Sequence, residues 1–203
     1  MKLYYSPGAC SLSPHIALLE AGLPFESVLV STKSHKLKDG EDFYDINSKG
    51  YVPLLELDDG QRISEGPVIV QYIADQAPAS KLAPANGTLE RYRLQEWLNF
   101  ITSELHKGFS PLFNPAMPEE AKAISRTKLL ERFGWVDAQL AGKQYLMGDQ
   151  FTVADGYLFT VSNWGHHVGV DLSGLPNLSA YRDRIAARPA VHAAMKAEGL
   201  IKT

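Results

Sequence analysis

The chain has 203 residues and a formal net charge of −3, with lysine and arginine spread along its length, so charge gives no case for nucleic-acid binding. No run approaches the roughly 20 apolar residues that a membrane span needs, and the N-terminal segment lacks the apolar stretch of a secretory signal. A single cysteine, Cys10, excludes an internal disulfide and a Cys-x-x-Cys pair. We therefore expect a cytoplasmic protein that binds neither nucleic acid nor a membrane.

Cys10 stands where a strand signal gives way to a helix signal. Residues 2–5 are typical of a strand, residues 6–9 of a turn, and Pro14 suits the first turn of a helix that continues to Glu20. A thiol at a helix start faces unpaired N–H groups and the positive end of the helix dipole, which favour the thiolate. A small buried apolar cysteine is the alternative, and the residues alone leave both interpretations open.

Strand and helix signals continue to alternate through the first eighty residues. The expected elements are a strand at 25–30, a polar loop at 31–40, a short helix at 41–46, a hairpin of 52–57 with 61–63, and a helix beginning near Ser64. In that last helix Val68, Ile69, Tyr72 and Ile73 follow the helical period and are expected to face inward. A cis peptide before Pro53 would cost only about 0.5–1 kcal/mol, so proline there leaves both isomers open.

The second part of the chain is predicted to be helical throughout. A connector rich in proline, alanine and glycine at 76–87 is the best domain boundary. Helices are expected at 88–113, 118–140, 153–167, 176–188 and 189–198. In the second of these, Leu129, Leu130, Phe133, Val136 and Leu140 are expected to face inward. The sequence therefore predicts an α/β domain at 1–80 and an all-α domain at 86–203.

Two helix starts and one histidine pair carry polar residues of interest. Glu65 lies at a helix start, where free N–H groups bind carboxylates and its own side chain could accept from an ammonium; a first-turn carboxylate serving the dipole is the alternative. Thr152 and Asp155 have capping-box spacing, which concerns folding and not catalysis. His166 and His167 are adjacent and lack a third ligand of suitable spacing, so we expect no metal site.

Several short motifs together resemble a bacterial beta-class glutathione S-transferase. They are Tyr4-Tyr5-Ser6-Pro7-Gly8-Ala9-Cys10-Ser11, Gly50-Tyr51-Val52-Pro53, Glu65-Gly66, Asn99, Glu104-Leu105-His106-Lys107 and Phe151-Thr152-Val153-Ala154-Asp155. The resemblance runs nearly end to end. It implies a thioredoxin-like N-terminal domain with a helical-bundle C-terminal domain, a homodimer, glutathione as cosubstrate in a detoxifying reaction, and a cis bond at Val52–Pro53.

The resemblance also implies roles for individual residues. Cys10 would lie beside the glutathione sulfur, and Val52 would pair main chain to main chain with the cysteinyl unit. Glu65 and the N–H of Gly66 would hold the γ-glutamyl end. The helical domain would contribute Asn99, Ser103, Glu104, His106 and Lys107 to the glutathione site, together with the electrophile site. The i, i+4, i+7 and i+8 spacing of four of these five residues on one helix face supports this assignment, and a structural histidine is the alternative for His106.

His35 departs from the family pattern. The family often carries a lysine at this place to meet the glycine carboxylate of glutathione, and a neutral imidazole brings no charge and only one donor. Lys33 or Lys36 could compensate, and the sequence does not choose between them.

The expected function is a glutathione transferase that conjugates or reductively processes small hydrophobic electrophiles, with Cys10 and His106 as catalytic residues. Ser11, and less seriously Tyr5, are alternative activators of the glutathione thiol. A glutaredoxin-like thiol-disulfide or deglutathionylating enzyme acting through Cys10 is the first alternative function. A non-catalytic glutathione-binding interaction module is the second.

Overall fold

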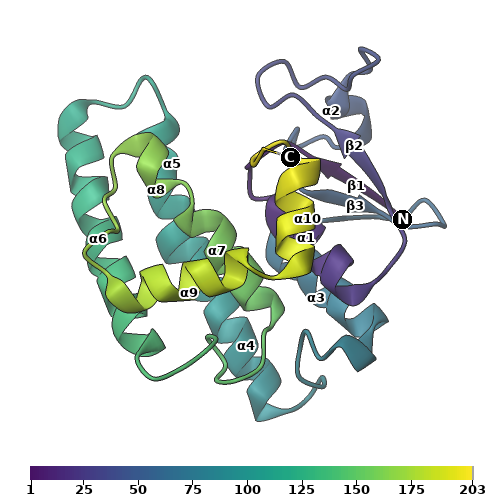
Figure 1. The fold of residues 1–203 in the computed structure, drawn as a ribbon. Helices are drawn as coiled ribbons and strands as arrows, with labels where there is room; N and C mark the ends of the chain where they lie inside the picture. The colour runs from purple at the N-terminus through teal and green to yellow at the C-terminus, as the bar shows by residue number, and fades with distance from the viewer. Residues whose placement is uncertain (203) are drawn as a thin grey trace. The chain divides into compact units, whose positions relative to one another are not determined.

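The computed structural model describes residues 1–202, which form two compact units. Unit 1 contains Met1–Ala83 together with the segment from Arg188 onward, and unit 2 contains Pro84–Ala187 (Figure 1). The C-terminal segment thus groups with the α/β part of the chain, whereas the sequence boundary placed it with the helical part.

Unit 1 is built on a mixed four-stranded sheet with the strand order β2-β1-β3-β4. The strands are β1 (Lys2–Tyr5), β2 (Glu26–Leu29), β3 (Leu54–Glu56) and β4 (Arg62–Ser64). β1 runs parallel to β2 and antiparallel to β3, and β3 pairs antiparallel with β4. The predicted strands and the predicted hairpin are confirmed. β1 has the predicted limits, β2 and β3 are shorter than predicted, and β4 begins and ends one residue later than predicted.

The register of the three strands β1, β3 and β4 brings three connecting segments to one end of the sheet. Tyr4 pairs with Leu54, and Leu54 pairs with Ser64. Directly beyond these residues the chain leaves β1 toward Cys10, enters β3 from the cis Val52–Pro53 peptide, and leaves β4 toward Glu65. The cis isomer that the resemblance implied is therefore present, and the segments of interest start from adjacent strands.

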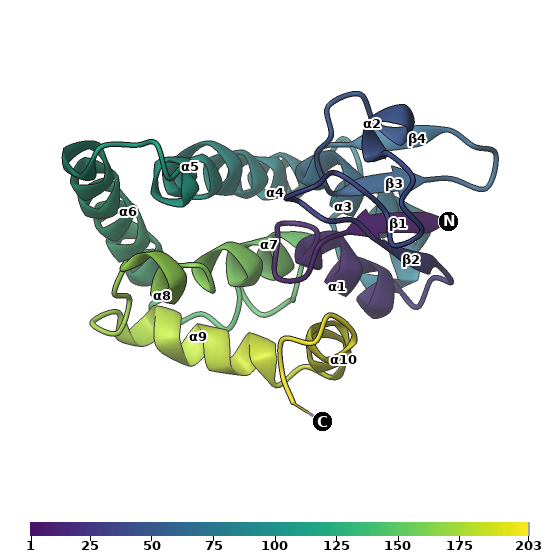
Figure 2. The same ribbon diagram turned by 90° about the horizontal axis from the view of Figure 1, so that it is seen from above.

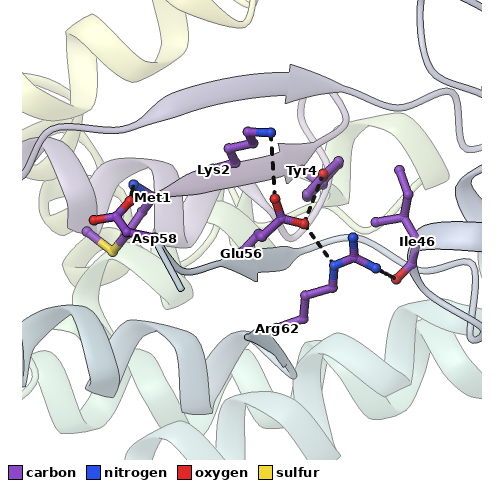
Figure 3. Close-up of polar contacts among 7 residues, drawn as sticks. All are labelled: Met1, Lys2, Tyr4, Ile46, Glu56, Asp58 and Arg62. Carbon is purple, nitrogen blue, oxygen red and sulfur yellow. Dashed lines mark hydrogen bonds and ion pairs between the residues drawn. The ribbon is translucent and has the colours of Figure 1, made fainter. Parts of the chain in front are cut away.

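A polar cluster around Glu56 links the strands at the other end of this register (Figure 3). The Glu56 carboxylate accepts a hydrogen bond from Arg62 Nε at 2.8 Å and one from the Tyr4 hydroxyl at 3.4 Å, and it lies 3.6 Å from Lys2 Nζ. Arg62 also donates to the Ile46 carbonyl at 2.7 Å. The hydrogen bond from Arg62 is the main reason that the pKa of Glu56 lies below its usual value. These contacts join β1, β3, β4 and the end of the short helix 43–46.

Five helical segments complete unit 1. They are α1 (Leu12–Ala21), α2 (Phe43–Ile46), α3 (Gly66–Gln76), the 3₁₀ turn η1 (Pro78–Ser80) and α10 (Pro189–Ala197). α1 contacts both α3 and α10, and Figures 1 and 2 show α10 alongside α1. In α3 the prediction for Val68 is wrong: its side chain is 51% exposed, and Val70 is buried instead.

Unit 2 is helical in every element longer than a turn. Its elements are α4 (Leu89–Phe100), the π-helix η2 (Ile101–His106), α5 (Lys107–Phe113), α6 (Glu119–Leu140), α7 (Val153–Ser162), α8 (Gly165–Val168) and α9 (Pro176–Ala186). The predicted continuous helix at 88–113 is thus interrupted by a π-helix, and the one at 153–167 divides into two. Leu130, expected to face inward, is 40% exposed, whereas its four companions in α6 are buried.

The capping box at the start of α7 is confirmed. The fully buried Asp155 carboxylate accepts from the N–H groups of Thr152 at 2.7 Å and Leu146 at 2.9 Å, and from the Tyr181 hydroxyl at 2.9 Å. Burial raises the pKa of Asp155, and these hydrogen bonds oppose that rise. Among the described helices, none is long and apolar enough to cross a membrane.

Candidate functional site

Cys10 lies in the partly buried loop between β1 and α1, next to the backbone of Val52. Its Sγ is 3.3 Å from the Val52 carbonyl oxygen, to which the thiol donates. Within the described residues the Val52 N–H has no acceptor, so this residue has a donor free for another backbone. The structure therefore brings together the two residues that the resemblance placed beside a glutathione cysteinyl unit.

Ser11 closes the Cys10 loop. Its fully buried hydroxyl accepts the Ser6 N–H at 3.0 Å and donates to the Ser6 carbonyl at 3.1 Å. Because this donor is already used inside the loop, Ser11 could reach a bound thiol only if the loop opened. Tyr5 is equally unsuited, since burial and then the charge of Glu198 raise its pKa and keep the phenol protonated. Cys10 remains the better candidate of the three.

A buried carboxylate from the end of α10 holds the same loop. Glu198 Oε2 accepts the Gly8 N–H at 2.9 Å, and Oε1 accepts a hydrogen bond from His15 Nδ1 at 2.8 Å. Both side chains are buried. Gly8 has φ +69°, and a Cβ there would lie 3.3 Å from Leu200 Cδ2, so glycine suits both its backbone and its contact with the C-terminal segment. No local sequence signal pointed to Glu198, because its partners lie near the other end of the chain.

The start of α3 carries a strained glutamate. Glu65 has φ +70°, a region that costs a non-glycine residue on the order of 1–3 kcal/mol, and such strain often marks a functional site. Its exposed carboxylate accepts from Lys49 Nζ at 2.8 Å, and the same ammonium donates to Ser64 Oγ at 3.3 Å. The Gly66 N–H has no acceptor among the described residues. Lys49 was missed at the sequence level, since it lies in a polar turn just before the Gly50-Tyr51-Val52-Pro53 motif and nothing in the sequence pairs it with Glu65.

His35 is held against the turn that precedes Val52. Its Nδ1 is 3.0 Å from the Gly50 carbonyl oxygen, and its ring lies 4.9 Å from that of Tyr44. A carbonyl only accepts, so Nδ1 carries the proton and the neutral ring presents Nε2 as an acceptor. Only protonated His35 could therefore donate to a carboxylate through Nε2. Lys33 and Lys36 are exposed.

In unit 2 the π-helix carries His106 at its end. His106 Nδ1 is 2.6 Å from the Tyr157 hydroxyl, and its ring forms a T-shaped pair with Trp164, with ring centroids 4.9 Å apart. Tyr157 and Trp164 are largely buried, so they orient the imidazole from α7 and the turn after it. π-Helical segments of this kind are frequent at functional sites.

The other residues predicted for the glutathione site from unit 2 lie in or next to the π-helix. Asn99 and Lys107 are exposed, Ser103 Oγ donates to the Asn99 carbonyl at 3.0 Å, and Glu104 pairs with Arg132 Nε at 2.8 Å. Because the π-helix pairs residues five apart, the 3.6-residue spacing argument does not hold through 101–106. Arg132 was not foreseen, since it comes from α6.

No group of three or more histidine, cysteine, aspartate or glutamate side chains among residues 1–202 could hold a metal ion. The ring centroids of the adjacent His166 and His167 are 3.7 Å apart. The pair still has no third ligand in the described part of the chain.

Comparisons with known proteins agree with these features. Residues 8–76 match the model of the family described as "Glutathione S-transferase, N-terminal domain", and residues 100–189 match "Glutathione S-transferase, C-terminal domain". Glutathione S-transferase GstA from Escherichia coli O157:H7 is 46% identical over 98% of this chain and 100% of its own length. A sphingomonad glutathione S-transferase complexed with glutathione is 51% identical, with a TM-score of 0.95 over 99% of this chain and 100% of that one. The bacterial beta-class enzyme of Sphingomonas chungbukensis is 51% identical, with a TM-score of 0.96 over the same shares.

Replacing Glu198 tests whether the C-terminal carboxylate sets the Cys10 loop. Glu198→Ala is expected to lower the free energy of unfolding by about 3–5 kcal/mol, because it leaves a buried imidazole and the Gly8 N–H unpaired. Glu198→Gln keeps an acceptor for Gly8 and should cost clearly less. Urea unfolding measures the stability, and the rate at which a thiol reagent modifies Cys10, the single cysteine, reports the loop.

The exposed Glu26→Ala serves as the matched control for removal of a carboxylate in unit 1. The role given to Glu198 would be contradicted if Glu198→Ala, Glu198→Gln and Glu26→Ala were equally stable and the rate of Cys10 modification did not change.

Proposed function

We propose that this chain, which belongs to the glutathione S-transferase family, joins glutathione, its cosubstrate, to a small hydrophobic electrophile through the site around Cys10. The observation that carries the proposal is the 3.3 Å contact between Cys10 Sγ and the Val52 carbonyl, beside a Val52 N–H that is free within the described residues. A thiol beside a free backbone N–H suits a peptide that itself carries a thiol. The similarity to bacterial beta-class enzymes supports the same assignment.

The tripeptide would lie along Val52 in the manner of an added strand. The Val52 N–H donates to the tripeptide backbone, and its carbonyl has a second lone pair for a tripeptide N–H. At the start of α3 the Gly66 N–H would hold the γ-glutamyl carboxylate, and Glu65 would accept from the γ-glutamyl ammonium. That ammonium would have to share Glu65 with Lys49, which already lies 2.8 Å away.

We assign Asn99, Ser103, Glu104, His106 and Lys107 to the part that the helical unit contributes. In this proposal residues 1–80 form the glutathione-binding domain, and residues 86–203 supply the electrophile site and the rest of the glutathione site, except that the segment from Arg188 onward supports the Cys10 loop within unit 1. The hydrogen bond between His106 and Tyr157 and the contact of His106 with Trp164 support a catalytic role, because they fix the imidazole in one orientation. Glu104 would act through a carboxylate that Arg132 already positions.

The chemistry follows from the sulfur of glutathione. A free thiol is only a few per cent ionised at pH 7, so stabilising the thiolate raises the population of the nucleophile. The thiolate then forms a carbon–sulfur bond with the electrophile, whose leaving group departs with the electron pair of the broken bond. Cys10, remaining a thiol, would turn its S–H from Val52 to the glutathione sulfur. Thiol-disulfide chemistry as the main activity is not favoured, because the close relatives are named glutathione S-transferases.

Replacement of Cys10 separates the two chemistries. Cys10→Ala is expected to abolish mixed-disulfide formation with oxidised glutathione but to leave part of the conjugating activity, because conjugation uses the sulfur of glutathione itself. Cys10→Ser, which keeps a donor toward Val52, should retain more conjugation than Cys10→Ala. Mass spectrometry detects the mixed disulfide, and a chromogenic electrophile reports conjugation. Equal loss of both activities with glutathione binding intact would contradict conjugation by the glutathione thiolate.

We also propose that the protein is a homodimer. Leu89 and Tyr92 on α4 are 66% and 60% exposed, a large apolar area for the surface of one helix. Sedimentation equilibrium at micromolar concentration should give twice the 22.4 kDa of the chain. A species of 22.4 kDa under those conditions would contradict the dimer.

His35 is proposed to meet the glycine carboxylate of glutathione when its ring is protonated. The affinity for glutathione should then increase as the pH falls from about 7.5 to 6. The one N–H of the neutral ring is bonded to the Gly50 carbonyl, so only the charged ring can donate from Nε2. The gain should be on the order of 1 kcal/mol, or about fivefold in affinity. Isothermal titration of glutathione at several pH values measures it.

His106 is a second histidine assigned to the same site, so the comparison requires His35→Lys. This variant should bind glutathione more tightly at pH 7.5 and lose the part of the pH dependence that comes from His35. Unchanged affinity and an unchanged slope would show that Lys33, Lys36 or no residue holds the carboxylate.

A further inference from the structure

Unit 2 contains a cavity of mixed polar and apolar lining to which none of the glutathione-site residues assigned above contributes. Its volume is about 510 Å³, and it is lined by Ser162, His166, Asp171, Ser179 and Arg182 together with apolar residues of the loop that connects α8 to α9. This volume lies within the range of small-molecule sites, roughly 300–1,000 Å³. The cavity is therefore large enough for a ligand of several heavy atoms.

Arg182 is the arginine of this cavity and brings its positive charge. Its guanidinium donates one hydrogen bond, from Nη2 to Asn163 Oδ1 at 2.8 Å, and makes no ion pair with any carboxylate among the described residues. Its Nε is buried without an acceptor, and burial lowers the pKa of the group. Half-buried arginines are ordinarily paired, because an unpaired buried charge is costly. This guanidinium is thus missing an anionic partner.

None of the other groups that line the cavity serves as the anionic partner of Arg182. Asp171 lies at the cavity, but its carboxylate accepts the Ser173 N–H and does not pair with Arg182. The charge of the neighbouring Asp183 favours the cation without making a contact. The Ser179 hydroxyl makes no hydrogen bond within the described residues, so it offers a further donor at the same cavity.

We propose that this cavity binds a small oxyanion, a carboxylate or a phosphate group, on the guanidinium of Arg182. Apart from the unpaired Nε–H, the guanidinium has three more N–H bonds without an acceptor among the described residues. Its planar fork of donors matches two oxygens of a carboxylate or a phosphate. Ser179 and His166 donate to the remaining oxygens. The Val170 and Leu172 side chains, also at the cavity, accommodate a short hydrocarbon part.

The test is a titration of the ¹⁵N-labelled full chain with inorganic phosphate and, separately, with acetate, at constant ionic strength set by chloride. The Arg182 Nε–Hε resonance and the amides of 162–182 should shift saturably with at least one of the two anions. The same titration follows Arg182→Gln and Arg184→Gln. Arg184 is the matched control, because it lies on the same helix, carries the same charge and bonds the Gln144 carbonyl on an exposed face.

Arg182→Gln should weaken the binding by at least about tenfold, and Arg184→Gln should leave it unchanged. Selective response to acetate would identify a carboxylate ligand, and selective response to phosphate a phosphate ligand. Equal weakening in both variants, or shifts spread over all exposed arginines and lysines, would overturn the proposal. If Arg182→Gln does not fold, the wild-type shifts decide: their absence at the cavity residues overturns the site as well.

Discussion

The pairing of Tyr4 with Leu54 and of Leu54 with Ser64 is the constraint on which the candidate site depends. Each pair is followed or preceded directly by a segment that carries chemistry, so the register of three short strands sets which groups meet. A shift of one residue would turn every side chain of a strand to the opposite face and would displace these segments together. The Glu56 cluster resists such a shift, because Arg62 and Lys2 bind the one carboxylate from the strand on either side.

Local signals were sufficient for most of the fold. The hairpin around Asp59-Gly60, the cap formed by Thr152 and Asp155, and the break at 76–87 each depend on residues close in sequence, and the structure has all three. The errors concern packing. Val68 has the helical spacing of an inward residue, yet Val70 is buried in its place, because the orientation of α3 is set by α1 and the sheet. The π-helix at 101–106 likewise has no composition signal that distinguishes it from an α-helix.

The site was predictable where its groups belong to a motif and unpredictable where they come from distant segments. The strand-to-helix junction marked Cys10 as a candidate and the helix start marked Glu65, although the positive φ of Glu65 had no sequence signal. Lys49 reaches Glu65 from a turn 16 residues earlier, and Arg132 reaches Glu104 from the next long helix, 28 residues later. Charged side chains on polar surfaces have many candidate partners in a sequence, so only the folded chain selects among them. The hydrogen bond between His35 and the Gly50 carbonyl also could not be predicted from the sequence. It leaves Nε2 as the ring nitrogen available to a ligand.

The Ser11 hydroxyl and the Glu198 carboxylate, which hold the Cys10 loop, differ in their sequence separation from the residues they bind. Ser11 closes the loop over five residues, so this part of the geometry forms with the first turn of α1. Glu198 binds Gly8 across 190 residues, so the loop is complete only when α10 has docked on α1. Burying that carboxylate beside His15 carries a desolvation cost that offsets much of the attraction between them. The pair therefore contributes less to net stability than to a single geometry, in which the thiol of Cys10 is aimed at Val52 only after both ends of the chain are in place.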